Sequence, residues 1–312
     1  MTGGRNPKDV AASVRARLLD LSRRGGVEFQ RVLSEFAIER LLYRLGMSPH
    51  ADRFVLKGAM LLKPWSPGSV RATWDLDLLG RGENTVDAVA AVVRDLCEVE
   101  ANDGIVFDHG SIVAEEIRAD EEYTGVRIRL LARLARARIP VQIDVGFGDA
   151  VVPPPRRETY PTLLDHLAPR ILVYPREAVV AEKLEAIVTL GTANTRMKDF
   201  YDVNLLASEF PFDGSVLVRA VRATFERRGT PLPETPPHAL STDFLGAPEQ
   251  QAQWRAFVRR SRLQAPPDGT TLARALQAFL EPVLVAASRG EDFRATWTPG
   301  GPWRLPEEAN RE

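Results

Sequence analysis

Apolar residues recur at helical intervals through the first 45 positions of the chain. Between Pro7 and about Leu45 they are spaced three and four residues apart, with an interruption at Gly25-Gly26. Because residues at these spacings share one face of a helix, the pattern predicts two amphipathic helices.

From residue 54 to residue 147 the pattern alternates between strand-like and helix-like stretches. The expected elements are a strand at 54–56, a helix at 58–62, a strand at 70–79, a helix at 85–98, and strands at 126–134 and 139–147. This order of mixed elements predicts an α/β or α+β sheet domain.

The segment Val152-Pro-Pro-Pro-Arg-Arg157 interrupts the pattern, because each proline fixes its own backbone and restrains its predecessor. We therefore predict a sheet domain over 1–155, a mostly helical domain over 156–298 and a disordered tail over 299–312. Helices are expected at 175–190, 197–208, 214–228, 247–263 and 270–288, with a proline-rich surface connection at 229–238.

The composition restricts the class of protein and the kind of metal site. A chain of 312 residues that is 44% hydrophobic can bury a substantial core, and it contains no long apolar run or secretory signal. We therefore expect a cytoplasmic protein without a membrane span. One cysteine and four scattered histidines disfavour a zinc site, so a metal would be held by oxygen, as Mg²⁺ or Mn²⁺ is. The net charge of -1 predicts no overall attraction to nucleic acid.

Two aspartates lie in the expected strand Thr73-Trp-Asp-Leu-Asp-Leu78. Alternate side chains of a strand share a face, so Asp75 and Asp77 project together, roughly 6–7 Å apart, while Leu76 enters the core. A divalent cation would remove their repulsion and bind phosphate oxygens, as in nucleotidyl displacement. The alternative is the solvated face of an edge strand.

A third carboxylate, Asp144, lies in the apolar strand Val141-Gln-Ile-Asp-Val-Gly-Phe147. An acidic side chain in such surroundings needs a partner. Metal shared with Asp75 and Asp77 would supply one, and the alternative is an ion pair with Arg127 or Arg129 of the neighbouring strand.

Lys183 points in the direction of the apolar stripe of its predicted helix. It could neutralise the phosphates of a nucleotide, or it could extend its ammonium group from the edge of the stripe to water. Glu182 and Glu185 are expected to point away into solvent.

Charges also gather at the start of the next helix, in Arg196-Met-Lys-Asp-Phe-Tyr-Asp202. Asp199 and Asp202 lie one turn apart on one face. Asp199 could orient or deprotonate an attacking hydroxyl while Arg196 or Lys198 contacts phosphate or nucleic acid. The alternative for Asp199 is a residue favoured by the helix dipole. Similarly, Gly58 could expose helix amides to a triphosphate, or it could be a simple turn.

Five motifs in series resemble the AbiEii/AbiGii toxin family, over roughly residues 30–210. They are Phe54-Val-Leu-Lys-Gly-Ala59, Arg71-Ala-Thr-Trp-Asp-Leu-Asp-Leu78, Val141-Gln-Ile-Asp-Val-Gly-Phe-Gly-Asp149, Glu182-Lys-Leu-Glu-Ala186 and Arg196-Met-Lys-Asp-Phe-Tyr-Asp202.

The resemblance implies a polymerase-β-like nucleotidyltransferase domain followed by a helical C-terminal half. It implies a toxin of a type IV toxin–antitoxin or phage-defence pair that transfers a nucleoside monophosphate from an NTP to RNA, such as the 3′ end of tRNA. The expected antitoxin is a DNA-binding repressor. By the motifs, Asp75 and Asp77 would hold Mg²⁺, Lys183 would contact the nucleotide phosphates and Asp199 would be the late catalytic aspartate.

The remaining motif residues imply substrate contacts. Arg71 and Thr73 match the family, as do Arg196, Lys198 and Asp202, whereas Lys57-Gly58-Ala-Met60 lacks the usual second glycine and the hydroxyl that follows it. Two other functions remain open: a metal-dependent nuclease or phosphohydrolase, and a degenerate binding module without activity.

Overall fold

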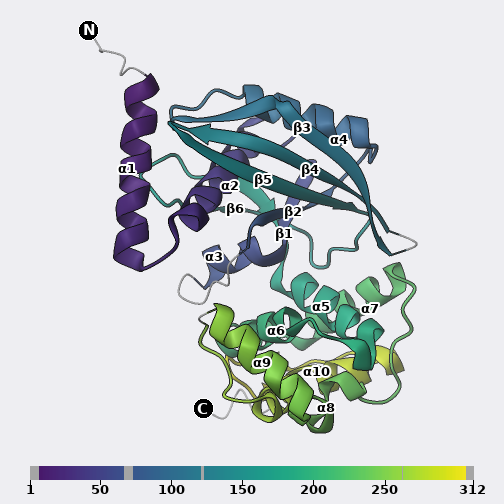
Figure 1. Cartoon of the computed structure of the whole chain (residues 1–312). Helices are drawn as coiled ribbons and strands as arrows, with labels where there is room; N and C mark the ends of the chain where they lie inside the picture. The colour runs from purple at the N-terminus through teal and green to yellow at the C-terminus, as the bar shows by residue number, and fades with distance from the viewer. Residues whose placement is uncertain (1–6, 67–72, 121–122, 262, 307–312) are drawn as a thin grey trace. The chain divides into compact units, whose positions relative to one another are not determined.

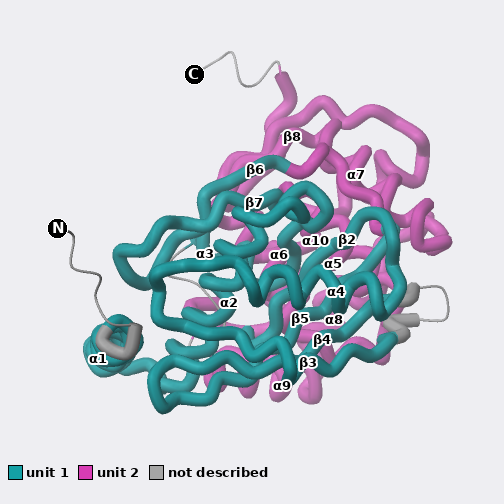
Figure 2. Tube along the Cα trace, turned by 90° about the horizontal axis from the view of Figure 1, so that it is seen from above, with its two compact units in different colours: residues 1–148, 156–173 teal, residues 149–155, 174–312 magenta. Residues whose placement is uncertain are grey.

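The computed structural model describes residues 7–66, 73–120, 123–261 and 263–306, and the chain divides into two compact units (Figures 1 and 2). Unit 1 comprises residues 1–148 and 156–173, and unit 2 comprises residues 149–155 and 174–312. The boundary predicted at residue 155 differs from this division, because residues 156–173 contribute two strands to the sheet of unit 1.

Unit 1 contains a mixed seven-stranded sheet with the strand order β3-β4-β5-β2-β1-β7-β6. Neighbouring strands are antiparallel except for the pairs β2–β5 and β1–β7, which are parallel. The strands are β1 (Phe54–Lys57), β2 (Asp75–Gly80), β3 (Ile105–Asp120), β4 (Tyr123–Leu134), β5 (Ala137–Phe147), β6 (Arg156–Thr159) and β7 (Arg170–Val173).

The helices α2 (Phe29–Met47) and α4 (Val86–Glu98) pack on the sheet, and α1 (Pro7–Gly25) packs on α2. Leu41 and Leu45 of α2 meet Leu76, Leu78 and the apolar stripe of α4 in a common core. Thr85 caps α4 by accepting a hydrogen bond from the amide of Ala88 at 3.2 Å. The predicted helix at 58–62 is instead a 3₁₀ turn, η1 (Gly58–Leu61), followed by the short helix α3 (Leu62–Trp65).

Helix α2 also buries charged side chains, which the apolar pattern did not indicate. Arg40 and Arg44 both contact Asp103, at 3.0 and 2.7 Å, and Arg40 donates to the carbonyl of Leu167 at 2.9 Å. The neighbouring Glu39 accepts the amide hydrogen of Leu163 at 2.6 Å. These contacts fasten the segment before β7 to the helix layer of unit 1.

Unit 2 is mostly helical, as predicted. Its main helices are α5 (Arg176–Leu190), α6 (Met197–Glu209), α7 (Gly214–Arg227), α9 (Pro248–Ser261) and α10 (Gly269–Arg289), with the shorter η2 (Gly191–Ala193), η3 (His238–Leu240) and α8 (Thr242–Gly246) between them. Both α5 and α10 pack against α6 and α7. The mixed α/β class with a helical second half is therefore confirmed.

The C-terminal segment is more ordered than predicted. The strands β8 (Phe212–Asp213), β9 (Thr296–Trp297) and β10 (Trp303–Arg304) form a small sheet in unit 2. Trp303 stacks on Phe279 with ring centroids 5.7 Å apart. The prediction of a disordered tail from residue 299 is thus wrong at least through β10, because aromatic packing holds this stretch against α10.

Candidate functional site

Asp75 and Asp77 lie on one face of β2, as the alternation predicted. Both side chains are half-buried, whereas the intervening Leu76 is 1% exposed and belongs to the core. The flanking Thr73 closes a local turn, since its hydroxyl lies 3.3 Å from the carbonyl oxygen of Asp75 and donates to it. The strand therefore holds two carboxylates on the polar face of the sheet.

Gly58 packs directly against Asp77. The strands β1 and β2 align Lys57 with Asp77, so that the turn after β1 lies beside the carboxylate. Gly58 has a φ of +73°, and a Cβ at this position would come within 2.8 Å of Cγ and 2.9 Å of Cβ of Asp77. Glycine is thus required here both by its backbone conformation and by close approach to a candidate metal ligand.

Asp144 aligns with Asp77 on one side and with Arg127 on the other. Arg127 binds it through two hydrogen bonds, 2.8 Å from Nε and 2.7 Å from a terminal nitrogen. Hydrogen bonding to Asp144 raises the pKa of the Arg127 guanidinium further above its usual range, against the lowering effect of burial. Of the two partners that the sequence allowed for Asp144, the structure shows the arginine.

The donor set around Asp75 and Asp77 fits a magnesium ion that is completed by its substrate. Across the described residues, groups of three or more histidine, cysteine, aspartate or glutamate side chains arranged to hold a metal are absent. Mg²⁺, however, is commonly held by one or two carboxylates, with water and phosphate oxygens in its other positions. Two adjacent carboxylates with closely packed backbone beside them meet that requirement.

In unit 2, Lys183 of α5 is held between two aspartates of α6. Its ammonium nitrogen lies 2.9 Å from Asp199 and 2.7 Å from Asp202, and both aspartates are 1% exposed. The alternative of a lysine that extends to solvent is therefore wrong, because the carboxylates hold its charge inside the unit. The predicted shared face of Asp199 and Asp202 is confirmed.

Asp199 carries a second cationic contact at the start of α6. Nε of Arg196 lies 2.7 Å from Oδ2 of Asp199, while Asn194, which is fully buried, accepts the amide hydrogen of Arg196 at 2.8 Å. The contact lacks the alignment of a hydrogen bond, and within the described chain Oδ2 accepts none. Lys198, on the same first turn, is exposed. Arg71, the remaining predicted contact residue, lies outside the described residues.

The prediction that Glu185 points into solvent is wrong. This carboxylate is 5% exposed, contacts Arg228 at 2.7 Å and accepts hydrogen bonds from Thr189 and Thr230 at 2.8 and 2.6 Å. Glu182 lies 3.6 Å from the same guanidinium. Because α5 is enclosed by both α6 and α7, residues outside its apolar stripe are buried as well. Arg228 follows α7 and was not identified by sequence reasoning, since its role depends on the packing of α7 on α5.

Among the described residues, no helix is both long and apolar enough to cross a membrane.

Comparison with known proteins identifies the family. The family model described as "Nucleotidyl transferase AbiEii toxin, Type IV TA system" matches residues 40–282. No curated protein matches the chain. Two crystal structures are partially similar to this chain, each with a TM-score of 0.46. JHP933 from Helicobacter pylori is 13% identical, with 84% of this chain and 95% of that chain covered. A candidate nucleotidyltransferase from H. pylori is 14% identical, with 86% and 100% covered.

The family match includes β2, α5 and α6, which carry the aspartate pair and the buried lysine cluster. It covers well over half of the 312 residues. The chain therefore belongs to the AbiEii family of nucleotidyltransferase toxins of type IV toxin–antitoxin systems.

Proposed function

We propose that this chain transfers a nucleoside monophosphate from an NTP to an RNA acceptor, the 3′ end of tRNA. Modification of that end would block aminoacylation and stop growth. In this proposal the protein acts in the cytoplasm as the toxin of a toxin–antitoxin or phage-defence pair, and a DNA-binding antitoxin counteracts it. Family membership supports the class of reaction and the existence of an antitoxin. The acceptor and the defence role are part of the proposal.

Asp75 and Asp77 would hold Mg²⁺, or Mn²⁺ in its place. When bound, the ion would neutralise the triphosphate and the charge that develops during displacement at the α-phosphorus. Gly58 would keep the Asp77 carboxylate in position by filling the space beside it with backbone alone. Asp144, which aligns with Asp77 and is bound by Arg127, would be the third carboxylate beside this ion.

Charged residues of unit 2 also have roles in this proposal. The Lys183 ammonium would bind the nucleotide phosphates, and Asp202 would hold it in place as a positioning residue. Asp199 would orient the attacking hydroxyl or accept its proton, which is the role that the family motif implies, and Arg196 would hold the carboxylate in place through its contact with Oδ2. The hydroxyl oxygen would then bond to the α-phosphorus as the bond to the bridging oxygen breaks and pyrophosphate leaves.

The observation that carries the proposal is the contact of Gly58 with Asp77 on a strand whose two aspartates share one face. The alternative of a solvated edge strand is wrong, because β2 lies between β5 and β1 inside the sheet. A strand face that is merely solvated also gives no reason for a left-handed glycine packed against one of the two carboxylates. A phosphate site that is completed by substrate does give a reason for such a glycine.

The test incubates the purified protein with Mg²⁺, total tRNA and each α-labelled NTP in turn, and compares it with the variants Asp75→Asn and Lys183→Met. We expect label in RNA for the wild type and a loss of at least about 100-fold in either variant. Shortened RNA that carries no label with any of the four NTPs would show that the protein is a nuclease and not a transferase. Equal labelling by Asp75→Asn would refute the metal assignment.

A further inference from the structure

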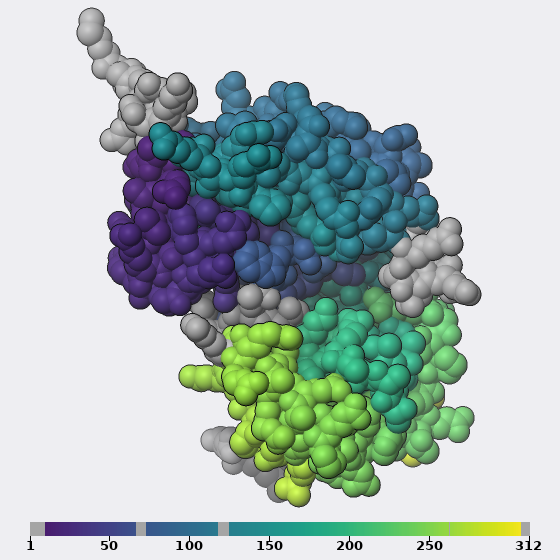
Figure 3. Space-filling view, viewed as in Figure 1, coloured from purple at the N-terminus to yellow at the C-terminus, as the bar shows by residue number. Residues whose placement is uncertain are grey.

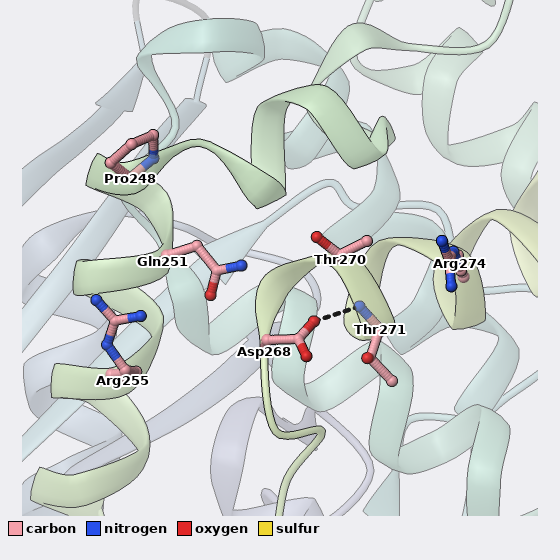
Figure 4. Close-up of a pocket in the computed structure, with 7 residues that line it drawn as sticks. All are labelled: Pro248, Gln251, Arg255, Asp268, Thr270, Thr271 and Arg274. Carbon is pink, nitrogen blue, oxygen red and sulfur yellow. Dashed lines mark hydrogen bonds between the residues drawn. The ribbon is translucent and has the colours of Figure 1, made fainter.

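An open groove lies between α9 and the start of α10 in unit 2, apart from the motif residues. Its volume is about 670 Å³, and Figure 4 shows Gln251 and Arg255 of α9 beside Thr270, Thr271 and Arg274 of α10. Pro248 and Asp268 complete the lining. Apart from that proline, the lining side chains all carry hydrogen-bonding groups, so the groove suits a polar ligand rather than an apolar one.

The segment that contributes the groove is basic although the chain as a whole is not. Residues 248–274 contain five arginines and two acidic residues, a local net charge of +3, whereas the whole chain has -1. Gln251, Arg255 and Arg259 recur every four residues on α9 and so follow one face of the helix. The segment around α9, yellow-green in Figure 3, forms part of the surface of unit 2.

These arginines are not used in ion pairs within the described part of the chain. Arg255, Arg259, Arg260 and Arg274 are all exposed, and none lies within salt-bridge distance of a described carboxylate. Unit 2 pairs other arginines, such as Arg228 with Glu185. Of these, Arg255 and Arg274 line the groove. Exposed guanidinium groups that form no ion pair and line a groove are typical of a surface that contacts phosphates.

The N-terminal end of α10 does not itself supply the anion site. The carboxylate of Asp268 accepts the amide hydrogen of Thr271 at 2.7 Å and so occupies the first turn of the helix. This hydrogen bond is the main cause of the lowered pKa of Asp268, and the charge of Arg274 also lowers it. Binding of an anion must rely on the arginines and on the threonine and glutamine side chains.

The opposite face of α9 connects the groove to a helix of the candidate site. Trp254 and Phe257 are buried, and the Phe257 ring lies 5.8 Å from the ring of Tyr201 on α6. Tyr201 lies between Asp199 and Asp202 in sequence. A ligand on the outer face of α9 would thus be bound by a helix that packs on the one carrying these aspartates.

We propose that this groove binds the sugar-phosphate backbone of the RNA acceptor, with Arg255 and Arg274 contacting phosphates and Thr270, Thr271 and Gln251 contacting phosphate or ribose oxygens. The choice of RNA rests on the proposed function. The groove gives a sequence-independent contact that holds the acceptor on unit 2 while its end is modified.

The test measures binding of 5′-labelled tRNA without NTP, by fluorescence anisotropy at several salt concentrations. The full-length double variant Arg255→Ala/Arg274→Ala is compared with Arg219→Ala/Arg289→Ala, which removes the same charge from exposed positions of α7 and α10 outside the groove. Circular dichroism and thermal unfolding establish that both variants are folded.

The association constant K falls as salt rises, so a plot of log K against log salt has a negative slope. Loss of two phosphate contacts should make this slope shallower by about 1.4 to 1.8. At 0.1 M salt this corresponds to a Kd about 25- to 60-fold higher for the groove variant, with the control within twofold of wild type. A groove variant that binds tRNA as tightly as the control, or with the same salt slope, overturns the proposal. If the groove variant loses binding but the wild type transfers no nucleotide, the groove assignment stands and the proposed function fails.

Discussion

Replacing Gly58 with alanine should reduce nucleotidyl transfer by about 100-fold, which is the cost of displacing a catalytic group by about 1 Å. The new methyl group would overlap the Asp77 carboxylate, with 2.8 Å to its Cγ. The backbone cannot easily give way, because Lys57 and Asp77 are aligned in the β1–β2 ladder. The carboxylate must therefore rotate away from its position.

The same substitution also strains the backbone, and a matched control separates the two effects. A non-glycine residue in the left-handed region costs about 1–2 kcal/mol. Gly82 has a φ of +89° in the same unit, and a Cβ there would meet no described atom within 4 Å. Gly82→Ala should therefore lose a similar amount of stability without moving either aspartate.

The assay combines chemical denaturation of both variants with initial rates of label transfer to tRNA at saturating NTP. Both variants should show a free energy of unfolding lowered by about 1–2 kcal/mol. Gly58→Ala should lose activity, and Gly82→Ala should keep it within about threefold. Equal activities in the two variants would show that the Gly58 backbone does not position Asp77.

Three further predictions concern stability and reactivity. Lys183→Met leaves two buried carboxylates without their shared cation and should lower the free energy of unfolding by about 3–5 kcal/mol in a urea titration. Lys198→Met, at an exposed site, should lower it by less than about 1 kcal/mol. Burial raises the pKa of Glu39 above 4.5, so its stabilisation is complete below that pH and is lost as the pH rises through the raised pKa. Glu39→Gln should therefore flatten the fall of stability with pH in this window, and an unchanged slope would contradict the burial effect. Burial likewise raises the pKa of the Cys97 thiol from 9.0 to about 11. At pH 8 a disulfide reagent should therefore label this thiol about 100-fold more slowly in the folded protein than in urea. Equal rates would show that the thiol is accessible and ionises normally.

The longer helices and the central strands could be predicted from sequence because each follows a single periodicity. The strand β3 could not, since Asp108-His-Gly-Ser111 interrupts its alternation and the structure shows a register shift between Asp108 and Val113. The strand β6 is short and largely exposed, so its sequence Arg156-Arg-Glu-Thr159 carries little apolar signal. The apolar run Ile171-Leu-Val173 did offer a signal for β7.

At the candidate site, the sequence was informative where one element determines the geometry. Alternation on one strand placed Asp75 and Asp77, and one helical turn placed Asp199 and Asp202. The sequence was not informative where the packing of two elements determines the position of a side chain. Burial of Glu185 depends on the packing of α7 on α5, and the contact of Gly58 with Asp77 depends on the register of β1 with β2.

We propose that Asp75 and Asp77 support transfer of a nucleotide to RNA. The most direct measurement is the intact mass of tRNA after incubation with Mg²⁺ and the four NTPs, with wild type and Asp75→Asn analysed in parallel. We expect tRNA heavier by one or more nucleoside monophosphates with wild type, and tRNA of unchanged mass with the variant. An unchanged or smaller mass with folded wild-type protein, or the same mass gain with Asp75→Asn, would contradict this proposal.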